Sequence, residues 1–450
     1  MALINLLGSA RGDHRPLSPH LLALRLPLIL LIAFHVTAAL AFSPWRSTQC
    51  PNEPGRRLHA AVESKECPVP GRIGIVSGGD GSGGANEDND NVMTWTLRPR
   101  CIDPWYKQIN TSSVDCLFTS TEFRNGHGIS LVTSTEVVSH LIGLEAFVDK
   151  PAPQPRSSPA EDDGAAAGPA YEIVPVEGKG MGVVATRRIR KDEIFMVDVP
   201  AMLISLNFLT STKPHHRRII LEQALSQLPP ETRDRAYALS RGSAPYEVDS
   251  IMGPNANSIL VTGEVHFGLF TEVARINHDC RPNAYYRFSE RRLTMEVVAF
   301  RDIEPGEEIS MSYVPLEMHM GERREYLKNN WEFDCACSLC RSPQEDIDNT
   351  TKWRDKVRSL RETVKNARSE GFQENAIAMA EEWLMVSEWD KTPPLMAEYH
   401  HTLADLYFLK GDMANATMYA RMAMDEWLRL GSVDDEQLEQ SRLFLRRLEN

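Results

Sequence analysis

Three cysteines in the segment FDCACSLC constrain the fold of this chain more than any other feature. Cys335, Cys337 and Cys340 are close enough in sequence to bind one tetrahedral Zn²⁺, which needs a fourth ligand. Cys280 is the only other cysteine in this half of the chain. We therefore expect a four-cysteine zinc site that ties residue 280 to the end of a domain. The alternative is two disulfides, but the three-cysteine spacing fits one ion better than two bridges.

The N-terminal forty residues have the pattern of a secretory signal. An apolar run, LPLILLIAFHVTAALAF, follows three arginines and contains the small-x-small sequence Ala39-Leu40-Ala41. The run is short for a transmembrane span, so we expect a signal peptide over residues 1–41 and no stable membrane span. A signal anchor and a wrongly assigned start codon are the alternatives.

Four more cysteines follow this signal. In an oxidising compartment they would form two disulfides with three possible pairings, and in the cytosol they would be free thiols. The four are Cys50, Cys67, Cys101 and Cys116. Three N-x-S/T sequons agree with secretion but can also occur by chance; they lie at Asn110, Asn349 and Asn415.

Composition indicates a globular protein with two or three domains. Of the 450 residues, 42% are apolar and 25% charged. The formal net charge of −13 argues against nucleic-acid binding, because a phosphate backbone repels an acidic surface. This charge is compatible with a partner that presents lysines or arginines, and equally with an acidic surface that maintains solubility.

Changes in pattern divide the chain. Residues 42–150 contain short β-type runs, TWTL, GISLVTS and EVVSHLIGLEAFV, and we expect a small α+β region with disulfides if the chain is secreted. Residues 151–170 are a linker rich in Pro, Ala and Ser. Residues 171–316 read as a β-rich domain of small sheets, with strands at YEIVPV, VVATRRI, IFMVDVPAMLI and within LTMEVVAFRDIEPGEEISMSY. A helical stretch over 213–242 interrupts them, split at Pro229-Pro230.

The chain ends in a zinc segment and a helical region. Residues 317–341 hold the three clustered cysteines, and residues 342–450 place Ala, Leu, Tyr and Trp at helical spacing. Small alanines against large aromatics in helical hairpins are typical of tetratricopeptide packing, although the period is not a clean 34 residues. We expect a TPR-like region, with an ordinary helical cap as the alternative.

Two further motifs carry little information when they are taken alone. EGKGMGVV holds three glycines within five residues, which lets a backbone turn approach a ligand but also fits any glycine-rich hairpin. Tyr313, in EEISMSYVP, ends a predicted strand and by itself favours a core position.

The order of the motifs changes their meaning. G-x-G-x-G-V, then NH-x-C-x-PN, then E-x-I-x-x-x-Y, then F-x-C-x-C-x-x-C resembles the signature of the SET-domain protein lysine methyltransferases. The resemblance covers residues 171–341, as a SET domain over 171–316 and a post-SET zinc segment over 317–341. It is closest to the SET–MYND type and to fungal SET proteins with a helical C-terminal region. The MYND finger is absent, since residues 197–270 contain no cysteine.

The resemblance implies a role for each matched position. Tyr313 matches the catalytic tyrosine, and the segment around Asn277 is expected to thread through a pseudoknot near the methyl-transfer point. Phe333 matches an aromatic residue that stacks on adenine, and Asn257 is a less certain match to a cofactor-contacting asparagine. The residues expected to contact S-adenosylmethionine are Lys179, Gly180, Met181, Gly182, Asn257, Asn277, His278, Tyr313 and Phe333.

The implied activity is S-adenosylmethionine-dependent methylation of a lysine ε-amine in a protein substrate, histone or non-histone. Methyl transfer is an in-line displacement that needs positioning and a neutral amine, but no nucleophilic cysteine. Cys280 is therefore better explained as a zinc ligand. The alternative is a non-catalytic SET-fold module that binds other proteins through its helical tail. We expect a monomer in either case.

The expected location stays open. The signal-like segment favours the secretory pathway, whereas the resemblance implies the cytoplasm or nucleus, where the cofactor is made and thiolates stay reduced.

Overall fold

A computed structural model describes residues 95–102, 114–148, 168–316, 318–370, 373–389, 396–430 and 436–449. The predicted signal peptide, most of the predicted linker, and the residues Cys50, Cys67 and Asn110 lie outside these ranges. Within them, no helix combines the length and the apolar character that crossing a membrane requires.

The largest sheet has six strands. In the order in which they lie across the sheet, these are β1 (Arg100–Cys101), β2 (Asp115–Ser120), β3 (Ile129–Ser134), β7 (Pro200–Ser205), β9 (Glu264–Phe270) and β8 (Ala256–Val261). Strands β3 and β7 pair in parallel, and the other neighbours are antiparallel. Strands from the predicted N-terminal region therefore continue the sheet of the predicted 171–316 domain. Both parts also share one core, in which Phe118 and Leu131 pack in the same cluster as Val183 and Phe195.

The first half of this sheet differs in detail from the prediction. GISLVTS is a strand, β3, but EVVSHLIGLEAFV forms helices α5 (Thr135–Leu141) and α6 (Glu145–Val148), so the β-type reading of that run was wrong. Ser134 caps α5, because its Oγ accepts a hydrogen bond from the Val137 N–H at 3.3 Å. Val137, Val138 and Leu141 then follow the spacing of a buried helix face.

Cys101 and Cys116 are directly opposite each other on β1 and β2 and form a disulfide. Since Cys50 and Cys67 lie outside the described residues, the expectation of two disulfides stays a prediction.

Two smaller sheets complete the β-rich part. One has the order β10 (Asn277–His278), β13 (Glu308–Met311), β5 (Gly180–Ala185) and β4 (Tyr171–Val176), and the other the order β11 (Ala284–Ser289), β12 (Thr294–Ala299) and β6 (Ile194–Asp198). The segment IFMVDVPAMLI, predicted as one strand, is split at Val199 into β6 and β7, which belong to different sheets.

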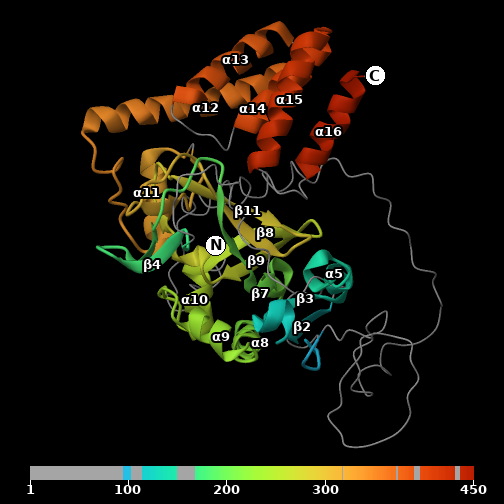
Figure 1. Cartoon of the computed structure of the whole chain (residues 1–450), viewed down its shortest axis with the longest axis vertical. Coiled ribbons are helices and arrows are strands. Elements are labelled where there is room, and N and C mark those ends of the chain that lie inside the picture. The colour runs from blue at the N-terminus through green and yellow to red at the C-terminus, as the bar shows by residue number, and fades with distance from the viewer. Residues whose placement is uncertain are drawn as a thin grey trace, which may run out of the picture.

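Helices cover one side of the large sheet (Figure 1). They are α7 (Leu206–Ser211), α8 (Pro214–Ser226), α9 (Pro230–Tyr237) and α10 (Glu247–Asn255). Two short helical turns lie elsewhere in the fold: α4 (Phe123–Gly126) between β2 and β3, and η2 (Val273–Arg275) after β9. The break between α8 and α9 falls at the Pro229-Pro230 pair, as predicted, because proline favours the first helical turn but not a helix interior. Ile220, Leu221 and Leu225 of α8 pack against the sheet.

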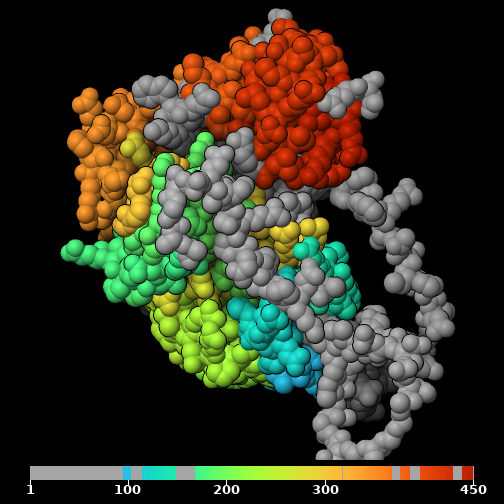
Figure 2. Space-filling model, in the orientation of Figure 1, coloured from blue at the N-terminus to red at the C-terminus, as the bar shows by residue number. Residues whose placement is uncertain are grey.

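The rest of the chain is helical. The helices are α11 (Met320–Trp331), α12 (Gln344–Glu370), α13 (Gln373–Trp389), α14 (Met396–Lys410), α15 (Met413–Leu430) and α16 (Glu436–Glu449). Consecutive helices from α12 to α16 pack on each other and form one body beside the β-rich part (Figures 1 and 2). The predicted helical C-terminal region is confirmed, while its TPR-like character stays a prediction. Asn349, one of the three sequon asparagines, lies within α12.

Candidate active site

A glycine hairpin forms one wall of the site. Strands β4 and β5 pair from Tyr171↔Ala185 to Val176↔Gly180, and Gly180 has a φ of +79° that side chains disfavour. At Gly182 an added Cβ would lie 2.7 Å from Asn277 Nδ2 and 2.5 Å from a methyl of Val176. The missing side chain thus creates the space that Asn277 occupies.

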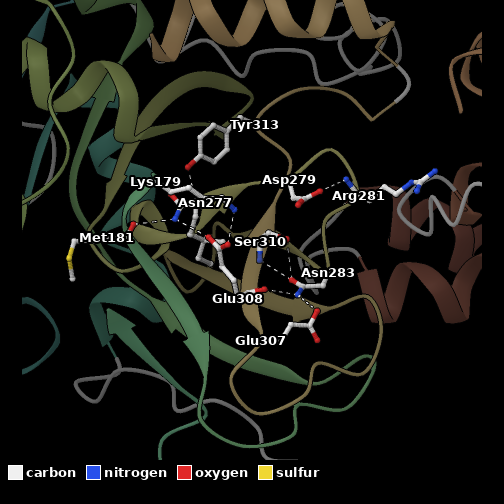
Figure 3. Close-up of polar contacts among 11 residues, drawn as sticks. Lys179, Met181, Asn277, Asp279, Arg281, Asn283, Glu307, Glu308, Ser310 and Tyr313 are labelled. Atoms are coloured by element: carbon white, nitrogen blue, oxygen red, sulfur yellow. Dashed lines mark hydrogen bonds and ion pairs between the residues drawn. The ribbon is translucent and has the colours of Figure 1, made fainter. Parts of the chain in front are cut away.

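Asn277 enters this space from a strand far away in sequence. Strand β10 pairs in parallel with β13, with Asn277 opposite Ser310 and His278 opposite Met311. The Asn277 amide nitrogen donates hydrogen bonds to Met181 O at 3.3 Å and to Glu308 Oε1 at 3.0 Å (Figure 3). The structure therefore brings together the glycine hairpin and the Asn277 segment, which sequence analysis had selected separately.

Glu308 connects these residues and was not selected from the sequence. Its Oε2 lies 2.7 Å from Lys179 Nζ, while its Oε1 accepts the hydrogen bond from Asn277. Both side chains of the ion pair are about one quarter to one third exposed. Asn283 supports the same strand from behind: its Oδ1 accepts from the Ser310 N–H at 2.8 Å, and its Nδ2 donates to Glu308 O at 2.9 Å (Figure 3).

Tyr313 lies just beyond the end of β13. Its hydroxyl donates a hydrogen bond to the carbonyl oxygen of Ile276 at 2.8 Å, the residue before Asn277. Burial raises the pKa of Tyr313 above its usual range, so the hydroxyl is neutral at physiological pH.

The carbonyl that Tyr313 contacts lies on a well-anchored turn. Asp198 Oδ2 accepts hydrogen bonds from the N–H groups of Glu272 and Val273, at 2.7 and 3.0 Å. Burial raises the pKa of Asp198 to about 7, despite these backbone donors. Ile276 then donates its own N–H to Val273 O at 3.1 Å, which fixes the direction of the peptide that follows.

The four cysteines selected from the sequence meet beside Tyr313. The sulfurs of Cys280, Cys335, Cys337 and Cys340 all lie within 4.8 Å of one another. Cys280 Sγ is 3.9 Å from Cys335 Sγ and 3.7 Å from Cys340 Sγ. Zn–S bonds of about 2.3 Å in a tetrahedron place sulfurs about 3.8 Å apart, so this donor set fits Zn²⁺. None of the four is in a disulfide in the structure.

Comparisons with known proteins identify this arrangement. The family model of the SET domain matches residues 180–314. Residues 180–314 are a SET domain. The predicted resemblance to the SET-domain lysine methyltransferases is confirmed by relatives as well.

Three relatives show how far the similarity extends. Histone-lysine N-methyltransferase set5 of Schizosaccharomyces pombe is 32% identical over 177 residues, which are 39% of this chain and 52% of set5. Histone-lysine N-methyltransferase SMYD3 of Homo sapiens is 31% identical over 180 residues, 39% of each chain. Histone-lysine N-methyltransferase SMYD1 of Homo sapiens is 24% identical over 205 residues, 39% of this chain and 41% of SMYD1. The chain thus spans about half of the first relative and about two fifths of the others.

His278 links the two halves of the SET-domain site. Its Nδ1 accepts a hydrogen bond from the backbone N–H of Tyr313 at 3.1 Å, so its proton is on Nε2, which lies 3.4 Å from Cys280 Sγ. Burial lowers the pKa of His278 to about 4, and the charges of Arg323 and Arg354 also lower it. A neutral imidazole therefore bridges a candidate zinc ligand and the backbone of the candidate catalytic tyrosine.

Aromatic side chains from the end of α11 and from the segment after it pack around Tyr313. Its ring centroid lies 5.1 Å from that of Trp331 and 6.4 Å from that of Phe333. Trp331 Nε1 donates a hydrogen bond to Pro254 O at 3.0 Å, which ties the end of α11 to the end of α10. Sequence analysis selected Phe333 but missed Trp331, although its position two residues earlier was a usable signal.

Asn257 is a predicted cofactor residue that lies apart from the contacts around Asn277 and Tyr313. It lies on β8, opposite Gly268. Among the contacts between described residues, no hydrogen bond links its side chain to the hairpin, to Asn277 or to Tyr313. The pseudoknot stays a prediction. The structure describes the parallel pairing of β10 with β13, which places the Asn277 segment beside the strand that precedes Tyr313.

Proposed function

We propose that this protein is an S-adenosylmethionine-dependent protein-lysine N-methyltransferase. The observation that carries this proposal is the Tyr313 hydroxyl, held against the Ile276 carbonyl beside Asn277 and the glycine hairpin. The names of the relatives, histone-lysine N-methyltransferases, support the same reaction class. The substrate is a protein that presents a lysine, either a histone or another protein.

The residues of the hairpin and of β10 fit the cofactor. We assign its binding to Lys179, Gly180, Met181, Gly182, Asn277, His278 and Phe333, and we keep Asn257 as a further candidate. S-adenosylmethionine, when bound, would supply an electrophilic methyl group, which a neutral lysine amine can attack with S-adenosylhomocysteine as the leaving group. The space left by the absent Cβ of Gly182 is what allows Asn277 to lie against the hairpin.

Tyr313 positions the reacting groups and does not become ionised. Its hydroxyl proton is donated to the Ile276 carbonyl. The lone pairs of its oxygen are therefore available to the sulfonium methyl group and to the substrate amine at the transfer point. Trp331 and Phe333 exclude water beside it. Desolvation of this kind lowers the pKa of a lysine amine and favours its neutral, nucleophilic form.

We also propose that Cys280, Cys335, Cys337 and Cys340 bind a structural zinc ion. The sulfur spacing of 3.7–3.9 Å supports this assignment over disulfides, whose sulfurs are about 2.05 Å apart. The ion would hold the segment that follows Phe333 against the segment that contains His278 and Cys280. We expect no direct nucleic-acid binding, and a monomer.

The decisive experiment is calorimetric titration of the zinc-loaded protein with S-adenosylmethionine and with S-adenosylhomocysteine. We expect saturable binding of both. A folded protein that binds neither would favour the alternative, a non-catalytic SET-fold module. Labelled S-adenosylmethionine incubated with a cell extract, followed by identification of the labelled protein, would then reveal the substrate.

Tyr313→Phe tests the assignment of the tyrosine itself. Without its hydroxyl, methyl transfer should fall by about 100-fold or more, because one positioned polar group at a transition state is worth about that much. Calorimetry should still show cofactor binding. A phenylalanine variant that transfers methyl groups at the original rate would remove Tyr313 from the catalytic role.

A further inference from the structure

A buried carboxylate at the end of β6 has no part in the reaction as described so far. Asp198 is 5% exposed, and its two oxygens accept three backbone hydrogen bonds. Oδ1 accepts from the Val199 N–H at 2.8 Å, and Oδ2 accepts from the N–H groups of Glu272 and Val273. Hydrogen bonds from N–H groups to a carboxylate are strong, and they offset the cost of burying it. Asp198 therefore attaches the end of β6 to a turn that begins 74 residues later.

That turn ends at the carbonyl that holds Tyr313. The two N–H groups that bind Asp198 Oδ2 lie at the start of η2, where helical N–H groups lack partners within the helix. At its end, the Ile276 N–H donates to Val273 O at 3.1 Å. The carbonyl of Ile276 then accepts the hydrogen bond of the Tyr313 hydroxyl at 2.8 Å. A continuous series of hydrogen bonds thus joins Asp198 to Tyr313.

Side chains from two other elements hold the outer side of this turn. The Tyr171 hydroxyl, on β4, donates to Glu272 Oε2 at 2.5 Å, and Arg235 Nη1, on α9, lies 3.5 Å from Glu272 Oε1. The Glu272 and Arg235 side chains are 32% and 41% exposed, so solvent screens their ion pair. Asp198, in contrast, binds the backbone of the turn and is buried.

We propose that Asp198 is a positioning residue for methyl transfer, which fixes the Ile276 carbonyl through η2 and thereby orients the hydroxyl of Tyr313. The proposal rests on the proposed function, because it assigns Asp198 a role in that reaction. A tyrosine hydroxyl rotates about its C–O bond, so the acceptor of its proton determines where its lone pairs point. A displaced carbonyl would direct these lone pairs away from the transfer point and leave the tyrosine ring in place.

Cofactor binding should depend little on this series of hydrogen bonds. Asn277 follows Ile276 in sequence, but its side chain is held separately, by Met181 O at 3.3 Å and by Glu308 Oε1 at 3.0 Å. Its strand also pairs with β13. A change at Asp198 should therefore lower the rate of methyl transfer and spare the affinity for S-adenosylmethionine.

Asp198→Asn is the direct test, because an amide keeps the shape of the carboxylate but replaces one acceptor with an N–H₂ donor. The assay measures label transferred from saturating S-adenosylmethionine to total extract protein. We expect this rate to fall by about 10- to 100-fold, as for a small misplacement of a reacting group. Calorimetry should show a cofactor affinity within about threefold of the wild-type value.

Glu193→Gln is the matched control at the other end of β6. Glu193 is 8% exposed, accepts the Arg190 N–H at 2.9 Å and pairs with Arg187 at 2.7 Å. Both variants should lower the melting temperature, because each loses hydrogen bonds to a buried carboxylate. Only Asp198→Asn should slow methyl transfer. Equal loss of transfer in the two variants would attribute the effect to stability and overturn the proposal.

A double-mutant cycle with Tyr313→Phe tests whether Asp198 acts through the tyrosine. Phenylalanine has no hydroxyl to orient, so adding Asp198→Asn to Tyr313→Phe should slow transfer by less than about twofold. Losses that multiply in the double variant would show that Asp198 acts elsewhere, and they would contradict the proposed role.

The pH dependence of the reaction supplies a measurement that leaves Asp198 unchanged and decides the matter if Asp198→Asn does not fold. Burial raises the pKa of Asp198 to about 7, and the charge of Glu272 also raises it. Of the other groups around the turn, Tyr171 has its pKa raised by burial and arginine stays protonated, so neither changes charge near neutral pH.

As the pH falls from about 8 to about 6, the Asp198 carboxyl gains a proton and loses an acceptor for the backbone donors. The ratio of the wild-type rate to the Tyr313→Phe rate should therefore fall over this range. This ratio cancels the ionisation of the substrate amine, which affects both proteins alike. A constant ratio would overturn the proposal.

The outcomes also distinguish this role from the proposed function. Wild-type protein that neither binds S-adenosylmethionine nor transfers its methyl group would remove the reaction and the role of Asp198 together. An active wild-type protein whose rate is unaffected by Asp198→Asn would remove the role alone.

Discussion

Glu308 orients two residues of the proposed cofactor site. It holds Lys179 by an ion pair at 2.7 Å and Asn277 by a hydrogen bond at 3.0 Å. By fixing the amide nitrogen of Asn277, it also determines the direction of the amide oxygen. A single carboxylate thus orients two residues that approach from different strands.

Replacing Glu308 with Gln should weaken S-adenosylmethionine binding by about fivefold, or about 1 kcal/mol, because a partly exposed ion pair and one oriented hydrogen bond are lost. Calorimetry would measure this change. Glu304→Gln is a matched control, since Glu304 is 65% exposed and pairs with Arg188 outside the site. Equal cofactor affinity in the two variants would contradict an orienting role for Glu308.

Individual site residues could be predicted from the sequence only where they belong to a recognisable motif. The spacing of the cysteines predicted a shared zinc site, and the family resemblance selected Asn277 and Tyr313; the structure brings these residues together. Glu308 has no such signal, because its partners, Lys179 and Asn277, come from distant segments of the chain. Only the three-dimensional register of β10 against β13 makes the role of Glu308 visible.

At the scale of elements, the turn between α4 and β3 shows how closely the N-terminal strands fit the rest. Gly128 has a φ of +76°, and an added Cβ would lie 2.3 Å from Pro229 at the start of α9. The carbonyl of His127 also accepts a hydrogen bond from Thr232 Oγ1 at 2.5 Å. The turn therefore packs directly on the helical insert.

Gly128→Ala should destabilise the protein by about 2–4 kcal/mol, because overpacking against a rigid proline adds to the cost of a positive φ. Gly126→Ala isolates the second cost, since Gly126 has a φ of +90° but nothing within 4 Å of an added Cβ. Denaturant unfolding would compare the two variants. Similar losses of unfolding free energy would argue against the close packing of this turn.

Elements were predictable where local signals dominated. Alternation and turn residues identified β4, β5 and β12, and the proline pair located the break between α8 and α9. The strand prediction for the run that forms α5 was wrong because Val137 and Val138 favour strands by propensity. The Ser134 cap and burial on one face overrode that preference.

At the scale of the whole molecule, the six-stranded sheet crosses the predicted boundary between the N-terminal region and the SET domain. The pairing of β3 with β7 joins residues 130–132 to residues 202–204. No property of the intervening linker sequence indicates that the chain returns to the same sheet. Pairing across such a distance is a non-local property, and local patterns do not contain it.

A chain that begins at residue 168 should therefore fail to fold cooperatively, although it contains the whole region matched by the SET family model. It would expose the edge of β7 and the part of the core that Phe118 and Leu131 fill. A chain that begins at residue 93 is the control and should remain soluble, with one thermal transition. Cooperative unfolding of the shorter chain would show that the N-terminal strands are dispensable.

The separation of the four cysteines along the chain has a kinetic consequence. Cys280 lies 55 residues before Cys335 and 60 before Cys340, and the β11–β12 hairpin and β13 form between them. In the proposed zinc site, three thiolates are close together in sequence and can bind an ion early, whereas we expect Cys280 to join them only when β10 has paired with β13. We therefore expect full coordination of the proposed zinc ion to be a late step of folding, one that follows assembly of the proposed cofactor pocket.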